Sequence, residues 1–352
     1  MSSTTFVLPD LYSVFSQWEV PQRMNKHYET VSKETEGWLS PFCQWERNKL
    51  VKLAAADFTY LPSVVFPDND YETFRTVSDY FTWAFVYDDR FDVGEFATDS
   101  DAAEIALSQT FRMLIGDPSA EALGAACEYS HGVDMALKDI WRRAYPQSSP
   151  GARRRFVETL GKWFESVLGQ INGAAPGDFL SVEDVVQLRV WSVADKPCYA
   201  LTEYALGINL TDEIMQIPAM ARIYDLTSEL MFLVNDIVSY AVEKDDGPTH
   251  NIISAIMLLR GVGVQAAMSE AEAMMVTRVA EWEAAKKDLA YLTGREGNDV
   301  REYISAMERW LVGCVSWSYR SKRYFGYEGA QVKDTLVVDL TTVLPSVTSA
   351  VA

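Results

Sequence analysis

The chain has 352 residues, of which 48% are hydrophobic, and its formal net charge is −19. This acidic balance argues against nucleic acid or an anionic membrane as the main partner, although bound metal ions could still bring in an anionic substrate. No run of about 18 apolar residues predicts a membrane span, and the lack of a signal-peptide pattern or a CxxC pair leads us to expect a cytoplasmic protein with free thiols.

Amphipathic helices account for most of the chain. Between short stretches rich in Pro, Gly and Asp, apolar residues recur at spacings of three and four, which is typical of helices. The pattern predicts an all-α protein with a single domain over residues 1–352 and a helical core from about residue 20 to about 325. Residues 328–352 are expected to be a C-terminal tail, in which LVVDLTTVLPSV has a short strand pattern.

The first unusual segment is FVYDDRFD, which ends an aromatic run with three aspartates. Spacings of three and four place two of these carboxylates on the same helical face as the aromatic stripe, and this face comprises Phe74, Val77, Phe81, Phe85, Asp88 and Asp92. Unpaired buried charges cost several kcal/mol each. Either the carboxylates are solvated at the end of a helix, or a cationic group meets them there. Asp89 lies about 100° away from Asp88 and is expected to have a structural partner rather than a metal.

The second unusual segment is MFLVNDIVSYAVEKDDG, residues 231–247. Asn235, Ser239 and Glu243 follow one another at intervals of four, so they drift by only about 80° and form one row of oxygen-bearing side chains on a helix. An amide carbonyl, a hydroxyl and a carboxylate are ligands that suit Mg2+. The alternative is a polar surface stripe. Together, two polar rows that each continue into apolar residues predict a ligand with a polyanionic head and a long apolar tail, such as a prenyl diphosphate.

At this point the chain resembles the class I terpene synthases, and in detail their fungal, mushroom-type branch. DDRFD is similar to the family's DDxxD motif, and NDIVSYAVE is similar to its NDxxSxxxE motif. Arg189 lies 235 − 189 = 46 residues before Asn235, which is similar to the position of the family's diphosphate-sensing arginine. The segment from Trp317 to Tyr324 resembles an arginine–tyrosine pair preceded by an active-site tryptophan. The resemblance covers about residues 55–325.

The resemblance implies an isoprenoid-synthase-like helical bundle around a central apolar cavity, onto which both metal-binding helices open. It implies a Mg2+-dependent enzyme with three metal ions, which ionises and cyclises a linear prenyl diphosphate, favouring farnesyl diphosphate, and releases a sesquiterpene and diphosphate. The metal ligands would be Asp88, Asp92, Asn235, Ser239 and Glu243. The diphosphate would meet Arg189, Arg323 and Tyr324.

Aromatic rings are expected to stabilise the carbocation that remains after ionisation. Phe85 and Trp317 are favoured because they neighbour the motifs, and Phe81 and Tyr60 are further candidates. Lys196–Pro197 predicts a helix break after Arg189, and the resemblance places Ser192 and Val193 there as linker and effector residues. The chain departs from the branch at GPTHN, where Pro248 replaces an acidic residue, and Lys244 follows the second motif; an exposed lysine is expected there.

Three alternatives stay open at this stage. A chain-elongating prenyltransferase would share the metal chemistry but normally has two aspartate-rich motifs. An acyclic alcohol synthase, of the linalool or nerolidol type, would quench the cation with water. A catalytically silent α-helical binding or scaffold protein would retain prenyl-diphosphate binding without turnover. In each case we expect a small-molecule ligand, no nucleic acid, no membrane span, and a monomer or homodimer.

Overall fold

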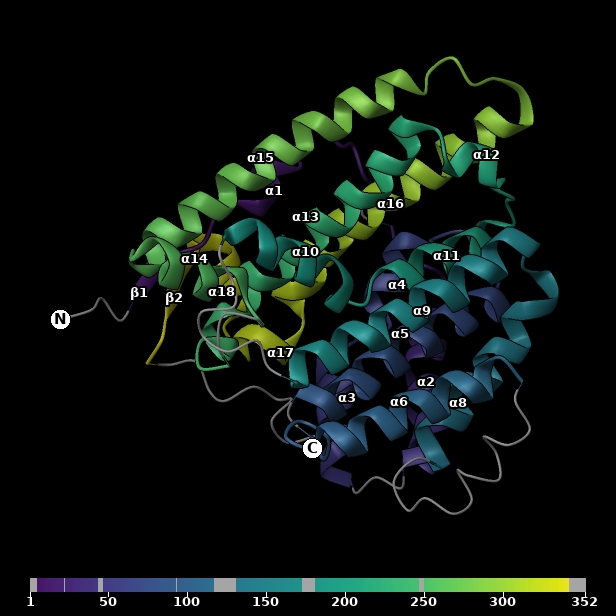
Figure 1. Ribbon diagram of the computed structural model, residues 1–352, viewed down its shortest axis with the longest axis horizontal. Helices are drawn as coiled ribbons and strands as arrows, with labels where there is room; N and C mark the ends of the chain where they lie inside the picture. The colour runs from purple at the N-terminus through teal and green to yellow at the C-terminus, as the bar shows by residue number, and fades with distance from the viewer. Residues whose placement is uncertain are drawn as a thin grey trace. The chain divides into compact units, whose positions relative to one another are not determined.

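The structure is a computed structural model that describes residues 5–21, 23–43, 47–92, 94–116, 131–172, 181–246 and 250–341. Helices make up almost all of its regular structure, and the described strands form one two-stranded sheet (Figure 1). The predicted all-α class is therefore confirmed.

The described residues fall into two units, each built from segments that are discontinuous in the sequence. Unit 1 contains residues 5–21, 181–195, 210–246 and 250–341, and unit 2 contains residues 23–43, 47–92, 94–116, 131–172 and 196–209. The expected single domain and its central apolar cavity depend on how the two units are placed relative to each other. Both therefore stay predictions.

Unit 2 is a bundle in which the aromatic helix α5 (Tyr71–Asp92) is the central element. In α5, 16 residues are buried, and they lie on nearly every side of the helix. Neighbouring elements therefore surround α5. The remaining elements are α2 (Tyr28–Cys43), α3 (Arg47–Ala56), α4 (Tyr60–Val65), α6 (Ser100–Leu114), α8 (His131–Ala144), η1 (Tyr145–Gln147), α9 (Pro150–Ile171) and α11 (Lys196–Leu206).

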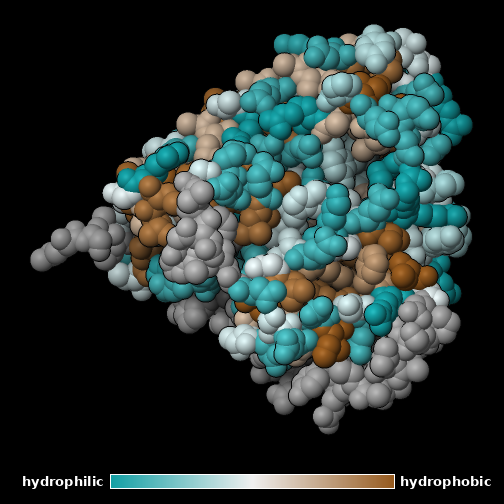
Figure 2. All heavy atoms as spheres, in the orientation of Figure 1, coloured by the Kyte–Doolittle hydropathy of each residue, from teal (hydrophilic) through white to brown (hydrophobic). Residues whose placement is uncertain are grey.

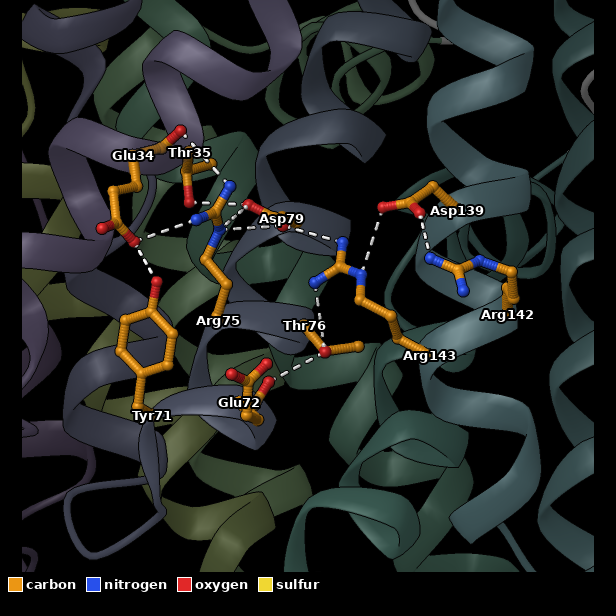
Figure 3. Close-up of polar contacts among 10 residues, drawn as sticks. All are labelled: Glu34, Thr35, Tyr71, Glu72, Arg75, Thr76, Asp79, Asp139, Arg142 and Arg143. Atoms are coloured by element: carbon orange, nitrogen blue, oxygen red, sulfur yellow. Dashed lines mark hydrogen bonds and ion pairs between the residues drawn. The ribbon is translucent and has the colours of Figure 1, made fainter.

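A buried polar cluster fixes α5 to two of these helices (Figure 3). The Asp79 carboxylate is fully buried and accepts hydrogen bonds from Thr35 of α2 at 2.7 Å, from Arg75 Nε at 2.8 Å and from Arg143 Nη2 of α8 at 2.8 Å. Both guanidinium groups also lie over the Trp38 ring, at 6.0 Å and 5.5 Å. A buried carboxylate needs such partners, so Asp79 specifies how α2, α5 and α8 meet.

Unit 1 is organised around the long helix α13 (Pro218–Glu243), which carries the second predicted metal row. Figure 1 shows α13 beside α15 and α16, and contacts join it to α10, α14 and α17 as well. The elements of this unit are β1 (Thr5–Val7), α1 (Leu11–Val14), α10 (Val182–Ser192), α12 (Asp212–Met215), α14 (Ile252–Arg260), α15 (Val264–Asp288), α16 (Gly294–Arg320), α17 (Lys322–Phe325), α18 (Gly329–Thr335) and β2 (Val337–Asp339).

Both ends of the described chain belong to the packed structure of unit 1. Strand β2 pairs antiparallel with β1, with Phe6 opposite Val338, and both side chains are buried. The Gln265 side chain of α15 accepts a hydrogen bond from Val7 N and donates one to Val7 O. The expected tail therefore begins with ordered structure, because residues 329–335 form α18 and residues 337–339 form β2. The ordered core also begins earlier than residue 20.

On the face drawn in Figure 2, the coloured surface is mostly hydrophilic, as the charge predicts. Hydrophobic residues gather over α14, where Leu258 is 59% exposed. Within the described residues no single helix is long and apolar enough to cross a membrane; α14 and α15 meet that test only together, and a bend of 115° separates them.

Candidate metal and diphosphate site

The predicted oxygen row of α13 is joined by hydrogen bonds. Ser239 is fully buried, and its Oγ donates to Glu243 Oε2 at 2.5 Å. Asn235, one turn earlier, is partly exposed and donates from Nδ2 to the hydroxyl of Tyr324 at 3.1 Å. The i, i+4 spacing thus produces the shared face that the sequence predicts, and this face meets α17.

Arg189 of α10 reaches the same place through a buried ion pair that sequence reasoning did not identify. Its Nη2 lies 2.5 Å from Asp236 Oδ1 and its Nε 3.2 Å from Asp236 Oδ2. Nη2 also lies 3.4 Å from Asn235 Oδ1, and Nη1 donates to Ser192 Oγ at 2.9 Å. Arg189 is only 7% exposed. The predicted sensing arginine therefore contacts the predicted metal row directly, at Asn235.

The Asp236 carboxylate is held in an environment of opposing influences. Burial raises its pKa to about 6, whereas the Arg189 guanidinium and the Ile252 N–H, which donates to Oδ2 at 2.6 Å, act to lower it. We take the group as ionised at pH 7, because two charge-assisted contacts to Arg189 favour the carboxylate. Asp236 thereby links α10, α13 and the first turn of α14.

The C-terminal part of the site is formed where α16 passes into α17. Ser321 caps α17, and Tyr324 is 3% exposed. Burial raises the pKa of the Tyr324 phenol, so its hydroxyl keeps a proton that it can donate. The Trp317 ring is 1% exposed and makes an edge contact with Tyr324, with ring centroids 5.7 Å apart. Arg323 is partly exposed beside Tyr324. These three predicted residues are thus neighbours.

Asn251 is a site residue that the sequence prediction did not single out. It is fully buried, and its Nδ2 lies 2.8 Å from Asp236 O, 3.0 Å from Glu243 Oε2 and 3.3 Å from Ser239 Oγ. Its Oδ1 accepts from Ile253 N and so caps α14. A signal was available in the GPTHN segment, where an Asn before an apolar run indicates a helix start.

His250 and Lys244 are two titratable residues in or beside this segment. Burial lowers the pKa of His250, and the nearby Arg189 guanidinium acts in the same direction, so the imidazole is neutral at pH 7. Lys244 is exposed and forms an ion pair with Asp245. Its expected exposure is confirmed. Pro248 lies outside the described residues.

The donor set on α13 fits Mg2+. Carbonyl, hydroxyl and carboxylate oxygens are hard ligands of the kind that this ion prefers. Within the described part of the chain no group of three or more His, Cys, Asp or Glu side chains is arranged around a common metal position. The α13 row is not a group of that kind, because two of its three proposed ligands, Asn235 and Ser239, would bind through neutral oxygens. A hydrogen bond brings Ser239 and Glu243 together.

The first aspartate cluster lies at the end of α5 in unit 2. Asp88 is partly exposed and Asp92 is exposed, whereas Asp89 is 5% exposed. The Arg90 guanidinium lies 4.8 Å from the centre of the Phe96 ring, and its Nε donates to Glu95 Oε1 at 2.7 Å. These contacts join the end of α5 to the residues that follow it. The two carboxylates predicted as metal ligands are thus the accessible ones, and the burial of Asp89 supports a structural role.

The aromatic stripe of α5 packs against a ring that sequence reasoning missed. Phe58 stacks on Phe85, with centroids 4.5 Å apart, and also makes an edge contact with Phe81 at 6.4 Å. Phe85 is partly exposed, whereas Phe58 and Phe81 are buried. Tyr60 is partly exposed and contacts Tyr28. Periodicity places residues on one face of a helix but does not indicate which loop residue covers that face.

The predicted helix break after Arg189 is present. Helix α10 ends at Ser192, Val193 is its C-cap, and α11 begins at Lys196. Ala194 has φ of 62°, in the left-handed region that costs a non-glycine residue about 1–2 kcal/mol. The side chain of Asp195 accepts a hydrogen bond from Ser228 Oγ of α13 at 3.0 Å. Ser192, the predicted linker, is the direct partner of Arg189.

Comparison with known proteins identifies the family. Residues 79–281 match terpene synthase family 2, C-terminal metal binding. Sesquiterpene synthase Agr1 of Cyclocybe aegerita is 30% identical over 334 residues, which cover 95% of this chain and 92% of that protein. Alpha-muurolene synthase of Coprinopsis cinerea is 30% identical over 348 residues, covering 98% and 80% respectively.

The fold has relatives of lower sequence identity among solved structures. A variant of cucumene synthase with a single substitution matches with a TM-score of 0.76 and 22% identity, over 87% of this chain and all of that one (100%). An α-eudesmol synthase matches with a TM-score of 0.73 and 19% identity, over 85% of this chain and 97% of the other. These likenesses confirm the isoprenoid-synthase-like fold. Since the family match spans more than half of the chain and the relatives align along nearly all of it, the chain belongs to the terpene synthase family, as its resemblance to the fungal branch predicted, and is a terpene synthase.

Proposed function

We propose that this terpene synthase catalyses the Mg2+-dependent ionisation and cyclisation of farnesyl diphosphate, releasing a sesquiterpene and diphosphate. The observation that carries the proposal is the polar junction in unit 1, where Arg189 and Tyr324 contact Asn235, one turn before the hydrogen-bonded pair of Ser239 and Glu243. The two fungal relatives described above, a sesquiterpene synthase and an alpha-muurolene synthase, support a C15 substrate.

The α13 residues would hold the metal through Asn235 Oδ1, Ser239 Oγ and Glu243 Oε1. When bound, Mg2+ supplies positive charge that stabilises the departing diphosphate. Arg189 supplies further charge from α10, and Tyr324 supplies a protonated hydroxyl. Arg323 is proposed to bind the diphosphate beside Tyr324. In unit 2, Asp88 and Asp92 are proposed as the other metal ligands, and three ions are proposed in all.

Breaking the carbon–oxygen bond leaves an allylic cation that would react with any water present. We propose that Phe85 and Trp317 shield this cation with aromatic faces, each contributing about 0.5–2 kcal/mol. Both rings are supported by other rings, Phe85 by Phe58 and Trp317 by Tyr324. A ring held in this way keeps its orientation while the charge moves. We also propose that the enzyme is cytoplasmic, acts as a monomer or homodimer and binds no nucleic acid.

The experiment is product analysis with purified protein. Geranyl, farnesyl and geranylgeranyl diphosphate are each incubated with Mg2+, and matched samples contain EDTA. Gas chromatography with mass spectrometry is expected to detect a cyclic C15 hydrocarbon or alcohol from farnesyl diphosphate, and nothing in the chelated samples. Linalool or nerolidol would show an acyclic alcohol synthase. Products from another chain length alone would overturn the substrate, and no product from any would overturn the proposed reaction.

A further inference from the structure

We propose that Asn251 is a positioning residue that sets the Ser239 hydroxyl and the Glu243 carboxylate for Mg2+. This inference rests on the proposed function, because it assigns a role relative to the metal row. Asn251 lies outside the row itself, at the start of α14, and Figure 1 shows α14 beside α13 and α10. Its side chain would act on the metal through its neighbours rather than by contact.

The amide of Asn251 has two N–H groups and three acceptors within reach. The shorter contacts, to Asp236 O at 2.8 Å and to Glu243 Oε2 at 3.0 Å, can each receive one proton, and Ser239 Oγ at 3.3 Å shares them more weakly. Glu243 Oε2 therefore accepts from both Ser239 and Asn251. Among the described residues, both hydrogen bonds to the Glu243 carboxylate go to Oε2. They fix the orientation of the carboxylate and leave Oε1 to bind a metal.

The hydroxyl of Ser239 is oriented by the same contacts. It donates its proton to Glu243, so its lone pairs point elsewhere; one receives the weak contact from Asn251 and the other is available to a metal. A ligand whose rotamer is fixed in advance loses less entropy when the metal binds. Partners of this kind, one step removed from a metal, typically change metal affinity about 10- to 100-fold when they are replaced.

Asn251 is itself fixed from two sides. Its Oδ1 accepts from Ile253 N at 2.9 Å, and the adjacent Ile252 N donates to Asp236 Oδ2 at 2.6 Å. Asp236 in turn holds Arg189. The first turn of α14 thus connects the proposed diphosphate arginine and the proposed metal carboxylate, and Asn251 is the residue that touches the ligands.

The chain provides a matched control in Asn25 of unit 2. Asn25 is also buried, its side-chain oxygen also accepts from the amide two residues later, at 2.9 Å, and its Nδ2 also donates to two acceptors, at 2.8 and 3.0 Å. Those acceptors are the backbone oxygens of Phe66 and Asn69. Replacing Asn25 therefore removes a comparable set of buried amide hydrogen bonds, three where Asn251 has four, all to backbone groups and none to a proposed metal ligand.

The test uses Asn251→Ser and Asn251→Thr, since both residues can still cap α14 but are too short to reach Glu243. The probe is inorganic diphosphate with increasing Mg2+, and the measurement is the thermal unfolding midpoint at each Mg2+ concentration. Both variants are expected to need about tenfold more Mg2+ for half of the maximal shift. Asn25→Ser is expected to unfold at a lower temperature with an unchanged Mg2+ requirement.

A double variant separates positioning from general damage. In a Glu243→Ala background, where the carboxylate that Asn251 orients is absent, Asn251→Ser is expected to cause less further change in the Mg2+ requirement than in the wild type, because most of its effect passes through that group. An unchanged requirement in Asn251→Ser, or an equal change in Asn25→Ser, would overturn this inference alone. A wild-type protein that shows no Mg2+-dependent shift would overturn the metal row together with it, while product formation from farnesyl diphosphate is judged separately.

Discussion

Each of the two motifs places an accessible proposed metal ligand next to a buried acid. Asp88 is partly exposed and Asp89 is buried; Asn235 is partly exposed and Asp236 is fully buried. Successive residues on a helix are about 100° apart, so one residue can bind a metal while the next fixes the helix. For Asp236 that second function is visible as the ion pair with Arg189. In such a pair, one residue is available to bind a metal and its neighbour fixes the helix, both within a single turn.

The carboxylate of Glu243 can be tested by Glu243→Gln. Glutamine keeps an oxygen that accepts from Ser239 and Asn251 but lacks the charge that Mg2+ requires, so kcat with farnesyl diphosphate is expected to fall about 100-fold or more. Glu229→Gln on the same helix is the control. It breaks ion pairs with Arg222 and Arg278 and is expected to lower stability but not kcat at 25 °C. Equal rates for wild type and Glu243→Gln would remove this row from the mechanism.

Phe85 can be separated from ordinary core residues by a pair of alanine variants. Phe85→Ala is expected to change the proportions of the products, because it alters a partly exposed ring, while the Mg2+ requirement stays constant. Phe91→Ala removes a ring that is 2% exposed on the same helix and is expected to cost about 3–5 kcal/mol of unfolding free energy without changing the products. Gas chromatography and chemical denaturation distinguish the two. If Phe85→Ala only destabilises, Phe85 is a core residue.

At this scale the sequence predicts faces better than partners. The interval of four in Asn235, Ser239 and Glu243 correctly predicts a shared face and the contact of the last two. The ion pair of Arg189 with Asp236 spans 47 residues, and the hydrogen bond of Asn251 to Glu243 joins residues eight positions apart on two different sides of the end of α13. Such partners depend on how helices pack, and helical periodicity carries no information about that.

At the scale of elements, a buried network determines where α5 lies in unit 2. Asp79 occupies the side of α5 opposite Asp88, since nine residues at about 100° each place them about 180° apart. The carboxylate receives Thr35, Arg75 and Arg143, which belong to three different helices including α5 itself (Figure 3). The helix that ends in the aspartate cluster is therefore fixed in rotation by charge on its other side. An apolar contact would allow more sliding.

This anchoring is tested by Asp79→Asn. The variant leaves Arg75 and Arg143 without their shared carboxylate in a buried site, so the unfolding free energy is expected to fall by about 3–5 kcal/mol. Asp139→Asn is the control, because Asp139 pairs with Arg143 and the exposed Arg142 at the surface and is expected to cost at most about 1 kcal/mol. Urea unfolding measures both. A small effect of Asp79→Asn would mean that apolar packing alone positions α5.

At the scale of the molecule, the two ends of the described chain meet and stabilise unit 1. Residues 5–7 and 337–339 form its sheet, and Phe6 contacts the Tyr240 ring, next to Ser239, at 5.6 Å. Tyr12 stacks on Tyr319 of α16 at 6.2 Å. The strand pattern near residue 337 was recognisable, but its partner was not, because three residues more than 300 positions away give too short a pattern to identify. The all-α class was predictable because long helices dominate the core.

The contribution of the N-terminal strand is measured by Phe6→Ala and Val7→Ala. Phe6 is 3% exposed and packs on α13, so its truncation is expected to cost about 3–5 kcal/mol of unfolding free energy. Val7 is 45% exposed and contacts Gln265 through backbone atoms that alanine keeps, so its truncation is expected to cost about 0.5 kcal/mol. Chemical denaturation compares them directly. Equal and small losses would show that unit 1 folds without the strand pair, whereas a large loss only for Phe6→Ala makes the N-terminal residues part of the structure that supports α13.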